Sequence, residues 1–217
     1  MARVKICGIT SLAEAQLAEK CGADAVGLLV GQRHKANDFI DRDTARRIFC
    51  SLPAFVTTVL VTHLEEEAEI LRLTEEVPCP VVQLHSDLAP SMLRAIRERL
   101  YPKKIIGMVS VENERAIERV RAIEDLVDNL ILDSTVPSTD RVGGTGLAHD
   151  WSISAKIVGI SKVPVILAGG LTPENVSEAI AVVNPWAVDV NSGVEGQDSR
   201  KSEGRIRRFI TAAKNSR

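Results

Sequence analysis

The sequence predicts an α/β protein of the (β/α)8 or TIM-barrel type, with residues 1–217 forming a single domain. Three observations support this prediction. Short aliphatic and β-branched runs alternate eight times with helix-length amphipathic segments. These runs are continuously Val, Ile and Leu, as in parallel sheets buried on both faces. The chain is long enough, and at 45% hydrophobic residues apolar enough, to build one large core.

The predicted elements follow one another in a regular order. The strands are Val4–Cys7, Ala25–Val30, Val56–Val61, Val81–Leu84, Ile105–Val109, Leu130–Asp133, Val165–Leu167 and Ala187–Val190. The helices are Ser11–Lys20, Arg42–Phe49, Leu64–Leu73, Ala89–Leu100, Asn113–Leu126, Ser152–Val158, Pro173–Val183 and Gly204–Lys214. Helices of this length between strands require parallel pairing, and eight such units close into a barrel.

Residues that begin and end helices support these boundaries. Thr172 precedes Pro173, which suits a hydroxyl N-cap followed by proline at the first helical position. The acidic run Glu65–Glu67 lies where the dipole of the third helix favours negative charge. Gly22 follows the first helix, where a left-handed cap favours glycine.

The alternative fold is an open, doubly wound parallel sheet. Its usual glycine fingerprint after the first strand is missing, and Cys7-Gly8-Ile9-Thr10 stands in its place. The barrel is therefore the favoured fold.

Composition and charge exclude several classes of function. The formal net charge is -2 and no segment concentrates Lys and Arg, so we expect neither a nucleic-acid nor a membrane partner. The apolar runs are far shorter than the roughly 20 residues of a membrane span. Met1 leads directly into the first strand without an apolar signal region, which predicts a cytoplasmic protein. The four cysteines form no CxxC pair, so we expect no metal site.

Barrel enzymes build their active sites from the carboxyl ends of the strands and the loops that follow them. That rule selects a small set of candidate residues. They are Cys7, Gln83, His85, Asp133, Gly169, Gly170, Asp189, Asn191, Ser192 and Gly193.

Glycines after the seventh and eighth strands suggest a phosphate site. Gly169-Gly170 and Ser192-Gly193 would let backbone N–H groups approach an anion closely, although tight turns needed only for connection also use glycine. Their occurrence at both strand ends favours phosphate. The irregular segment 134–150 contains Gly144 within a glycine-rich stretch, which is typical of a substrate loop.

The candidate acids and bases each have a structural alternative. A cysteine such as Cys7 is most often a small apolar core residue. Asp133 ends an apolar strand, where it serves either catalysis or the capping of backbone N–H groups in the next loop. His85 is either a base or a hydrogen-bonded structural histidine. The other histidines are expected to be solvated; they are His34, His63 and His149.

These motifs resemble those of one family, phosphoribosylanthranilate isomerase, in family order over nearly the whole chain. The most specific are the opening KICGIT and the later LAGGLTPENV. The full set is VKICGIT (4–10), GADAVG (22–27), VQLH (82–85), LD (132–133), GGTG (143–146), DW (150–151), LAGGLTPENV (167–176), VDV (188–190) and SGVE (192–195).

The resemblance implies an Amadori rearrangement of an N-linked aldose phosphate to an amino-ketose phosphate, without metal or cofactor. It assigns Cys7 as the general base that removes the C2 proton, and Asp133 as the general acid that opens the furanose ring. Such a base must be poised as a thiolate, which positive potential nearby would favour. It implies one partner, a phosphosugar substrate, and leaves monomer or homodimer open. The binding residues would be Gln83, His85 and Asp189 for the substrate and Gly144, Gly169, Gly170, Ser192 and Gly193 for the phosphate.

The loop after the second strand departs from the family pattern. Family members carry an arginine there that pairs with the anthranilate carboxylate, whereas this sequence places Asp38 at that position. Either Arg33 or Lys35 takes its role, or the acceptor differs. Two alternatives to the isomerase follow: a paralogue that isomerises another phosphorylated N-glycoside, and a non-catalytic phosphosugar-binding barrel. Asn191, where the family has serine, is a smaller departure.

Overall fold

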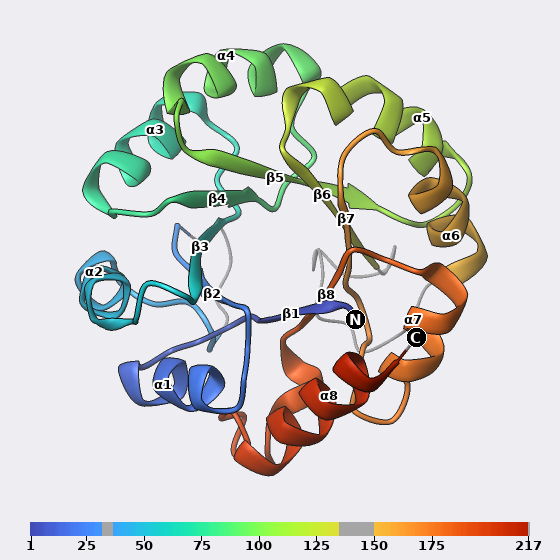
Figure 1. Cartoon of the computed structure of the whole chain (residues 1–217). Helices are drawn as coiled ribbons and strands as arrows, with labels where there is room; N and C mark the ends of the chain where they lie inside the picture. Colours follow the sequence, from blue (N-terminus) through green and yellow to red (C-terminus); the bar gives the residue numbers. More distant parts are fainter. Residues whose placement is uncertain (32–36, 135–149, 217) are drawn as a thin grey trace.

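Eight parallel strands form a closed barrel in the computed structural model, which describes residues 1–31, 37–134 and 150–216 (Figure 1). Each strand pairs with the next along the chain, and β8 pairs back to β1. The predicted (β/α)8 barrel is therefore confirmed. The strands are β1 (Arg3–Ile6), β2 (Ala25–Leu29), β3 (Thr57–Thr62), β4 (Val81–Leu84), β5 (Lys104–Ser110), β6 (Asn129–Asp133), β7 (Val165–Leu167) and β8 (Ala187–Val190).

The helices of the described residues surround the barrel as an outer ring (Figure 1). Helix α8 shows why: Ile206, Phe209, Ile210 and Ala213 recur at helical spacing and are all buried. The α-helices are α1 (Leu12–Lys20), α2 (Arg42–Ser51), α3 (Glu67–Glu76), α4 (Pro90–Leu100), α5 (Arg115–Ile123), α6 (Trp151–Ile160), α7 (Val176–Val183) and α8 (Glu203–Asn215); two short 3-10 helices are η1 (Glu124–Leu126) and η2 (Ser192–Val194). None of these helices has the length and apolarity of a membrane span.

Side chains alternate along each strand between the barrel interior and the helices. Val59 and Val61 belong to the interior cluster, whereas Leu60 packs in the cluster that includes the helices. Two charged residues, Lys5 and Asp189, are also buried on the strands. The apolar interior is filled by Cys7, Leu29, Val59, Val61, Ile106, Met108, Ile131, Ile166, Ala168 and Ala187.

Helix α7 begins at Val176, so the prediction that Pro173 opens it is wrong. The Asn175 side chain explains the later start, because its Oδ1 accepts from the Thr172 N–H at 2.8 Å and its Nδ2 donates to the Gly170 carbonyl at 2.9 Å. These two bonds hold residues 172–175 in a turn of their own, against the glycine loop that follows β7.

Two other helix boundaries can be compared with those predicted from the sequence. Helix α3 begins at Glu67 rather than Leu64, because Glu66 has extended backbone and serves as the N-cap. Gly22 has a φ of +96° and its N–H donates to the Glu19 carbonyl, so the predicted glycine cap is confirmed.

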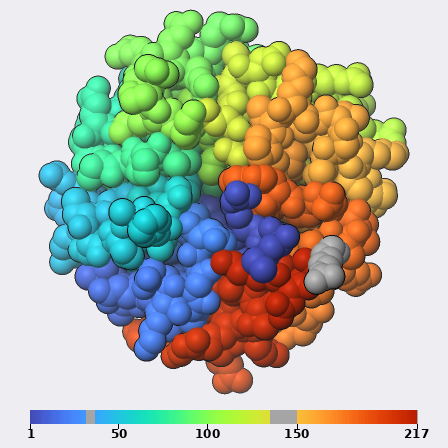
Figure 2. Space-filling view, in the orientation of Figure 1, coloured from blue at the N-terminus to red at the C-terminus, as the bar shows by residue number. Residues whose placement is uncertain are grey.

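The amino-terminal end of the barrel faces the viewer in Figure 2. The first residues of the chain lie at the middle of this face, beside α8. Because Met1 and Ala2 precede β1, this is the end of the barrel at which the strands begin. The carboxyl ends of the strands, where a barrel active site is expected, lie on the opposite face.

The left-handed backbone at Gly22 gives a stability prediction. Gly22→Ala is expected to destabilise the protein by about 1 kcal/mol or more, because an L-residue is strained at this φ. Gly159→Ala is the matched control: it lies within α6 with nothing within 4 Å of an added Cβ, and we expect it to stabilise by about 0.5–1 kcal/mol. Urea unfolding measures the change in the free energy of unfolding for both variants. A change in the same direction for both would contradict the prediction.

Candidate active site

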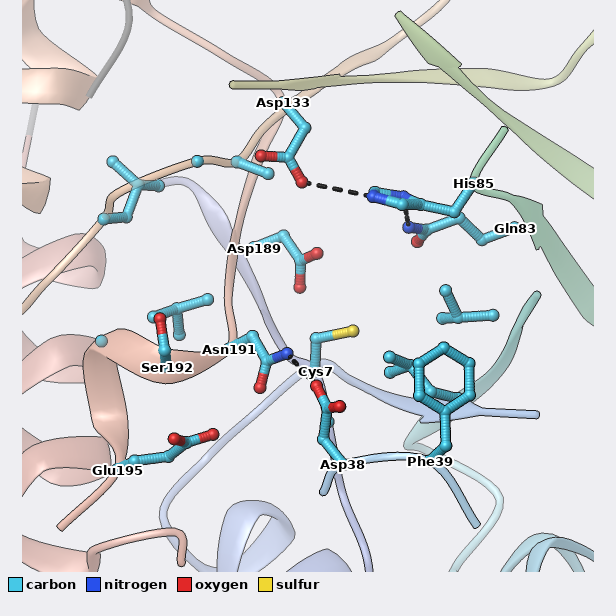
Figure 3. Close-up of a pocket in the computed structure, with 18 of the residues that line it drawn as sticks. Cys7, Asp38, Phe39, Gln83, His85, Asp133, Asp189, Asn191, Ser192 and Glu195 are labelled. Carbon is cyan, nitrogen blue, oxygen red and sulfur yellow. Dashed lines mark hydrogen bonds and ion pairs between the residues drawn. The ribbon is translucent and has the colours of Figure 1, made fainter. Parts of the chain in front are cut away.

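A cavity of about 370 Å³ lies at the carboxyl ends of the strands (Figure 3). Every site candidate from the sequence that falls within the described residues lines it. They are Cys7, Gln83, His85, Asp133, Gly169, Gly170, Asp189, Asn191, Ser192 and Gly193. The candidates Arg33, Lys35 and Gly144 lie outside the described residues, so their roles stay predictions.

Cys7 directly follows β1 and is held by barrel closure, because its N–H donates to the carbonyl of Val190 at 2.8 Å. Its side chain is 6% exposed. Gly27 on the neighbouring strand makes room for it: an added Cβ there would lie 2.7 Å from the Cys7 sulfur and 3.0 Å from Lys5 Cε. Both atoms lie close to this Cβ position, so the Cys7 thiol and the aliphatic part of the Lys5 side chain are neighbours inside the barrel.

A buried ion pair lies beneath the thiol. Lys5 Nζ and Asp189 Oδ2 are 2.8 Å apart, and both side chains are almost completely buried. Burial acts to lower the pKa of Lys5, but attraction to Asp189 and then to Cys7 outweighs it, so the pKa is raised. The second oxygen of Asp189, Oδ1, has no hydrogen-bond partner among the described residues. It is therefore a buried hydrogen-bond acceptor without a donor, on a residue that lines the cavity.

The thiol of Cys7 is neutral in the site as it stands. Burial is the largest influence and raises its pKa to about 11. Lys5 and Lys201 act to lower this pKa, whereas Asp189 and Asp38 act to raise it. The positive potential expected from the sequence is present, but it does not overcome desolvation.

Asp133 ends β6 and lies across the cavity from Cys7 (Figure 3). Its Oδ1 accepts from the Ser134 N–H at 2.7 Å, so it does cap the loop. Its Oδ2 is 3.4 Å from His85 Nε2. The two roles that the sequence left open for Asp133 are thus compatible, since one oxygen caps and the other faces the cavity.

His85 lies between Gln83 and Asp133. Its Nδ1 is 2.9 Å from Gln83 Nε2, and its Nε2 is 3.4 Å from Asp133 Oδ2. With the Gln83 amide donating to Nδ1, a proton on Nε2 faces Asp133.

His63 is not solvated, which corrects the prediction from the sequence. It is 9% exposed and lines the cavity just after β3. Its ring centroid lies 4.9 Å from that of His85 and 5.2 Å from that of Phe39, which meets it edge-on. The sequence placed His63 near an element end, but at the carboxyl end of an interior strand such a side chain turns into the cavity.

The glycines after β7 adopt backbone that other residues rarely reach. Gly169 and Gly170 have φ values of +80° and +64°. A Cβ on Gly169 would lie 2.9 Å from Asp133 Oδ1, so glycine there also makes room for the acid. Within the described part of the chain, the N–H groups of Gly170, Ser192 and Gly193 have no hydrogen-bond acceptor. Three free donors at one end of the cavity form a site suited to an anion.

Close contact holds the two glycine loops together. A Cβ on Gly193 would lie 1.9 Å from the Leu171 carbonyl oxygen, so only glycine fits there. Arg205 fixes the same peptide, because its Nε and Nη2 donate to the Gly193 carbonyl at 3.1 and 3.0 Å. Arg205 thereby fixes the position of the Gly193 turn at this end of the cavity.

Asp38, the residue that departs from the family pattern, contacts Asn191. Asn191 Nδ2 donates to Asp38 Oδ2 at 2.7 Å. Lys201 Nζ donates to Asn191 Oδ1 at 2.6 Å and to Glu195 Oε1 at 2.9 Å. The two departures noted in the sequence are therefore hydrogen-bonded partners.

Besides His63, sequence reasoning missed Lys5, Asn175 and Lys201, which also shape the site. Lys5 carried a signal, because it lies two residues before Cys7 and so shares its face of the strand. Asn175 and Lys201 carried no signal in spacing, since each reaches the site through the tertiary packing of loops. Asn175 buttresses Gly170, and Lys201 bonds Asn191.

Fold and site together define the class of protein. A thiol and a carboxylic acid group face each other across a cavity whose one end offers free backbone N–H groups, at the carboxyl end of a (β/α)8 barrel. Within the described ranges no group of three or more His, Cys, Asp and Glu has the arrangement of a metal site. This is an α/β-barrel enzyme site built for acid–base chemistry.

Comparison with known proteins identifies the family. Residues 4–212 match the family described as N-(5'phosphoribosyl)anthranilate (PRA) isomerase. N-(5'-phosphoribosyl)anthranilate isomerase 2 of Methanosarcina mazei is 45% identical over 213 residues, which cover 98% of this chain and 94% of that protein. The chain belongs to the phosphoribosylanthranilate isomerase family and is an isomerase.

Solved structures agree with this assignment. The crystal structure of phosphoribosyl anthranilate isomerase from Thermotoga maritima has a TM-score of 0.85 and 40% identity, with 99% of each chain covered. A family structure in complex with reduced 1-(o-carboxyphenylamino)-1-deoxyribulose 5-phosphate has a TM-score of 0.82 and 38% identity, again with 99% of each chain covered.

The raised pKa of Cys7 predicts slow alkylation near neutral pH. Only the thiolate reacts, so the rate with iodoacetamide should rise about tenfold per pH unit until the pH approaches about 11. Mass spectrometry at Cys7 between pH 7 and 10.5 measures the rate, and the exposed Cys50 in the same sample verifies the reagent. A Cys7 rate that has already levelled off at pH 8 would contradict the prediction.

Removing one member of the buried ion pair should cost more than removing both. Lys5→Met leaves the Asp189 carboxylate buried without its cation and is expected to destabilise by about 3–5 kcal/mol. Lys5→Met with Asp189→Leu removes both charges and should cost much less. Chemical unfolding of the two variants tests this; a double variant less stable than the single one would overturn it.

Proposed function

We propose that this chain catalyses the cofactor-independent Amadori rearrangement of N-(5'-phosphoribosyl)anthranilate to 1-(2-carboxyphenylamino)-1-deoxyribulose 5-phosphate, a step of tryptophan biosynthesis. The observation that carries the proposal is the placement of Cys7 and Asp133 on opposite sides of one cavity, next to free backbone donors (Figure 3). Membership of the isomerase family supports it independently.

The phosphate of the substrate would be anchored between the loops after β7 and β8. The free N–H groups of Gly170, Ser192 and Gly193 supply donors, and Gly169 allows the close approach of the backbone. Gly144 is expected to add to this anchor. Fixing the phosphate leaves the ribose to extend across the cavity, toward both proposed catalytic groups.

Asp133 would act as the general acid. It protonates the furanose ring oxygen, the bond between this oxygen and C1 breaks, and the nitrogen lone pair forms an iminium with C1. His85 Nε2–H, 3.4 Å from Asp133 Oδ2, would orient the carboxyl group and later stabilise the carboxylate. Gln83 in turn holds the imidazole in the tautomer that can donate.

Cys7 would act as the general base after the ring has opened. The iminium is positively charged, and positive charge beside the sulfur lowers the thiol pKa from its high value in the site without substrate. The thiol would first lose its own proton to solvent in the cavity. The resulting thiolate takes the C2 proton, the C2–H electrons form a double bond with C1, and the iminium nitrogen is neutralised. Tautomerisation of this enolamine gives the aminoketose. The thiolate is thus favoured at the step that needs it.

Asp189 would bind a ribose hydroxyl. Its Oδ2 is engaged by Lys5, whereas Oδ1 is buried without a partner and lines the cavity. An O–H donor from the sugar would satisfy it.

The part of the cavity that would hold the non-sugar group of the substrate, the aglycone, supports one further candidate function. Asp38 lines the cavity and presents a carboxylate, which would repel the carboxylate of anthranilate and attract an N–H donor. This observation favours a second phosphorylated N-glycoside, with a donor group at that position, as an alternative substrate. With anthranilate as aglycone, Arg33 or Lys35 would instead have to bind its carboxylate.

We propose the following partner, oligomeric state and location for this chain. The partner is a small phosphosugar, and the chain acts as a monomer or homodimer in the cytoplasm, without nucleic acid or membrane. Sedimentation equilibrium distinguishes the two oligomeric states.

Turnover of phosphoribosylanthranilate tests the proposed function. The loss of substrate fluorescence should be catalysed by the unmodified protein, and Cys7→Ala and Asp133→Asn should each lower kcat by about 10²–10⁴-fold. Cys50→Ser on the exposed face of α2 is the control and should leave kcat unchanged. No turnover by the unmodified protein would overturn the function, whereas turnover unaffected by both substitutions would overturn the assigned roles.

The variant Asp38→Arg tests whether the natural substrate is phosphoribosylanthranilate or another phosphorylated N-glycoside. If anthranilate is the natural non-sugar group and another cation already binds it, affinity for phosphoribosylanthranilate should not rise, because the variant also loses the bond between Asp38 and Asn191. A large gain in affinity would show that the natural acceptor lacks the carboxylate.

A further inference from the structure

Asn191 lies between the thiol and the phosphate loop. It follows β8 directly and precedes Ser192, the first residue of η2. Its carboxamide packs on the residue after the thiol: Gly8 has a φ of +68°, and a Cβ there would lie 2.1 Å from Asn191 Oδ1. The amide thus occupies the place that a side chain on residue 8 would fill.

The orientation of this amide is set by its two partners. Lys201 can only donate and lies 2.6 Å from Oδ1, whereas the carboxylate of Asp38 can only accept and lies 2.7 Å from Nδ2. A flipped amide would place donor against donor and acceptor against acceptor. The side chain of Asn191 therefore has one orientation, and it joins the loop after β2 to the segment before α8.

Lys201 is itself held rigidly. Its side chain is 1% exposed, and its ammonium donates to the Asn191 carbonyl at 3.1 Å, to Asn191 Oδ1 at 2.6 Å and to Glu195 Oε1 at 2.9 Å. These three acceptors match its three hydrogens. Its backbone N–H donates to Glu14 Oε1 at 3.1 Å, and the other oxygen of Glu14 accepts from the N–H of Thr10 in the loop after β1. The buried ammonium is therefore saturated and serves as an anchor rather than as a free cation for substrate.

We infer that Asn191 is a positioning residue which, held between Lys201 and Asp38, fixes the Cys7–Gly8 turn relative to the Ser192–Gly193 turn. The inference rests on the proposed function, in which one turn carries the base and the other anchors the phosphate. A substrate fixed at its phosphate then presents C2 to the sulfur at a set distance. In this role Asp38 acts by accepting the hydrogen bond that holds the Asn191 amide in its orientation.

A reciprocal exchange tests this role. Asn191→Asp puts two carboxylates against each other and breaks the bond to residue 38. Combining it with Asp38→Asn restores one donor and one acceptor with reversed polarity and leaves the net charge of the cluster unchanged. Displacement of the turns by about 1 Å would lower kcat by on the order of 10²-fold in the single variant. The double variant should recover most of this loss, whereas the Kd for inorganic phosphate should change little in either.

A second readout does not depend on turnover. Inorganic phosphate at the Ser192–Gly193 turn places negative charge near Cys7, which should slow its alkylation by iodoacetamide in the unmodified protein. Asn191→Asp should weaken this protection, and the reciprocal double variant should restore it.

The outcomes separate the two proposals. A single variant that keeps both kcat and protection, or a double variant as impaired as the single one, would overturn the positioning role. A third outcome is that phosphate protection of Cys7 is lost in Asn191→Asp and restored in the double variant, while the unmodified protein does not turn over phosphoribosylanthranilate. That outcome would support the positioning role and refute the proposed substrate.

Discussion

Closure of the barrel between β1 and β8 is the constraint on which the site depends. The two strands lie at opposite ends of the sequence and pair in parallel, from Arg3 with Ala187 to Ile6 with Val190. The N–H of Cys7 continues this ladder to the Val190 carbonyl. Closure therefore brings the thiol of the first strand beside the loop that follows the last strand. Without it, the proposed base and the proposed phosphate anchor would belong to separate edges of an open sheet.

The interior of this barrel holds charged as well as aliphatic side chains. Lys5 and Asp189 neutralise each other below the cavity, and Lys201 is neutralised and saturated beside it. Both arrangements offset the cost of burial by ion pairing and hydrogen bonding. Their common result is a thiol surrounded by fixed charges of both signs, in which desolvation outweighs the nearby cations and raises the pKa. Under the proposed mechanism, positive charge on the substrate would lower this pKa at the step that needs a thiolate.

Much of the fold and part of the site were accessible from the sequence. The alternation of apolar runs and helical segments predicted all eight strands, because burial on both faces leaves a continuous apolar signature. The rule that strand carboxyl ends carry the site selected Cys7, Asp133, Gln83 and His85, which do meet in one cavity. The start of α7 was missed, because the Asn175 side chain bonds Gly170 and Thr172 and holds residues 172–175 in a turn before the helix. His63 was missed because its burial depends on packing against Phe39 and His85.

The sequence by itself determined the barrel class, the family resemblance and the residues that are proposed as acid, base and phosphate-binding turns. These properties reside in local patterns, namely periodicity, strand ends and contiguous motifs. The tertiary structure decided the direction in which the pKa of the thiol shifts, the placement of His85 against Asp133 and the partner of Asp38. Each of these depends on groups distant in sequence: Lys201 beside Cys7, Asp133 beside His85, and Asn191 beside Asp38. Coulomb forces and hydrogen bonds act over a few ångströms of space, and only the closed barrel sets those distances.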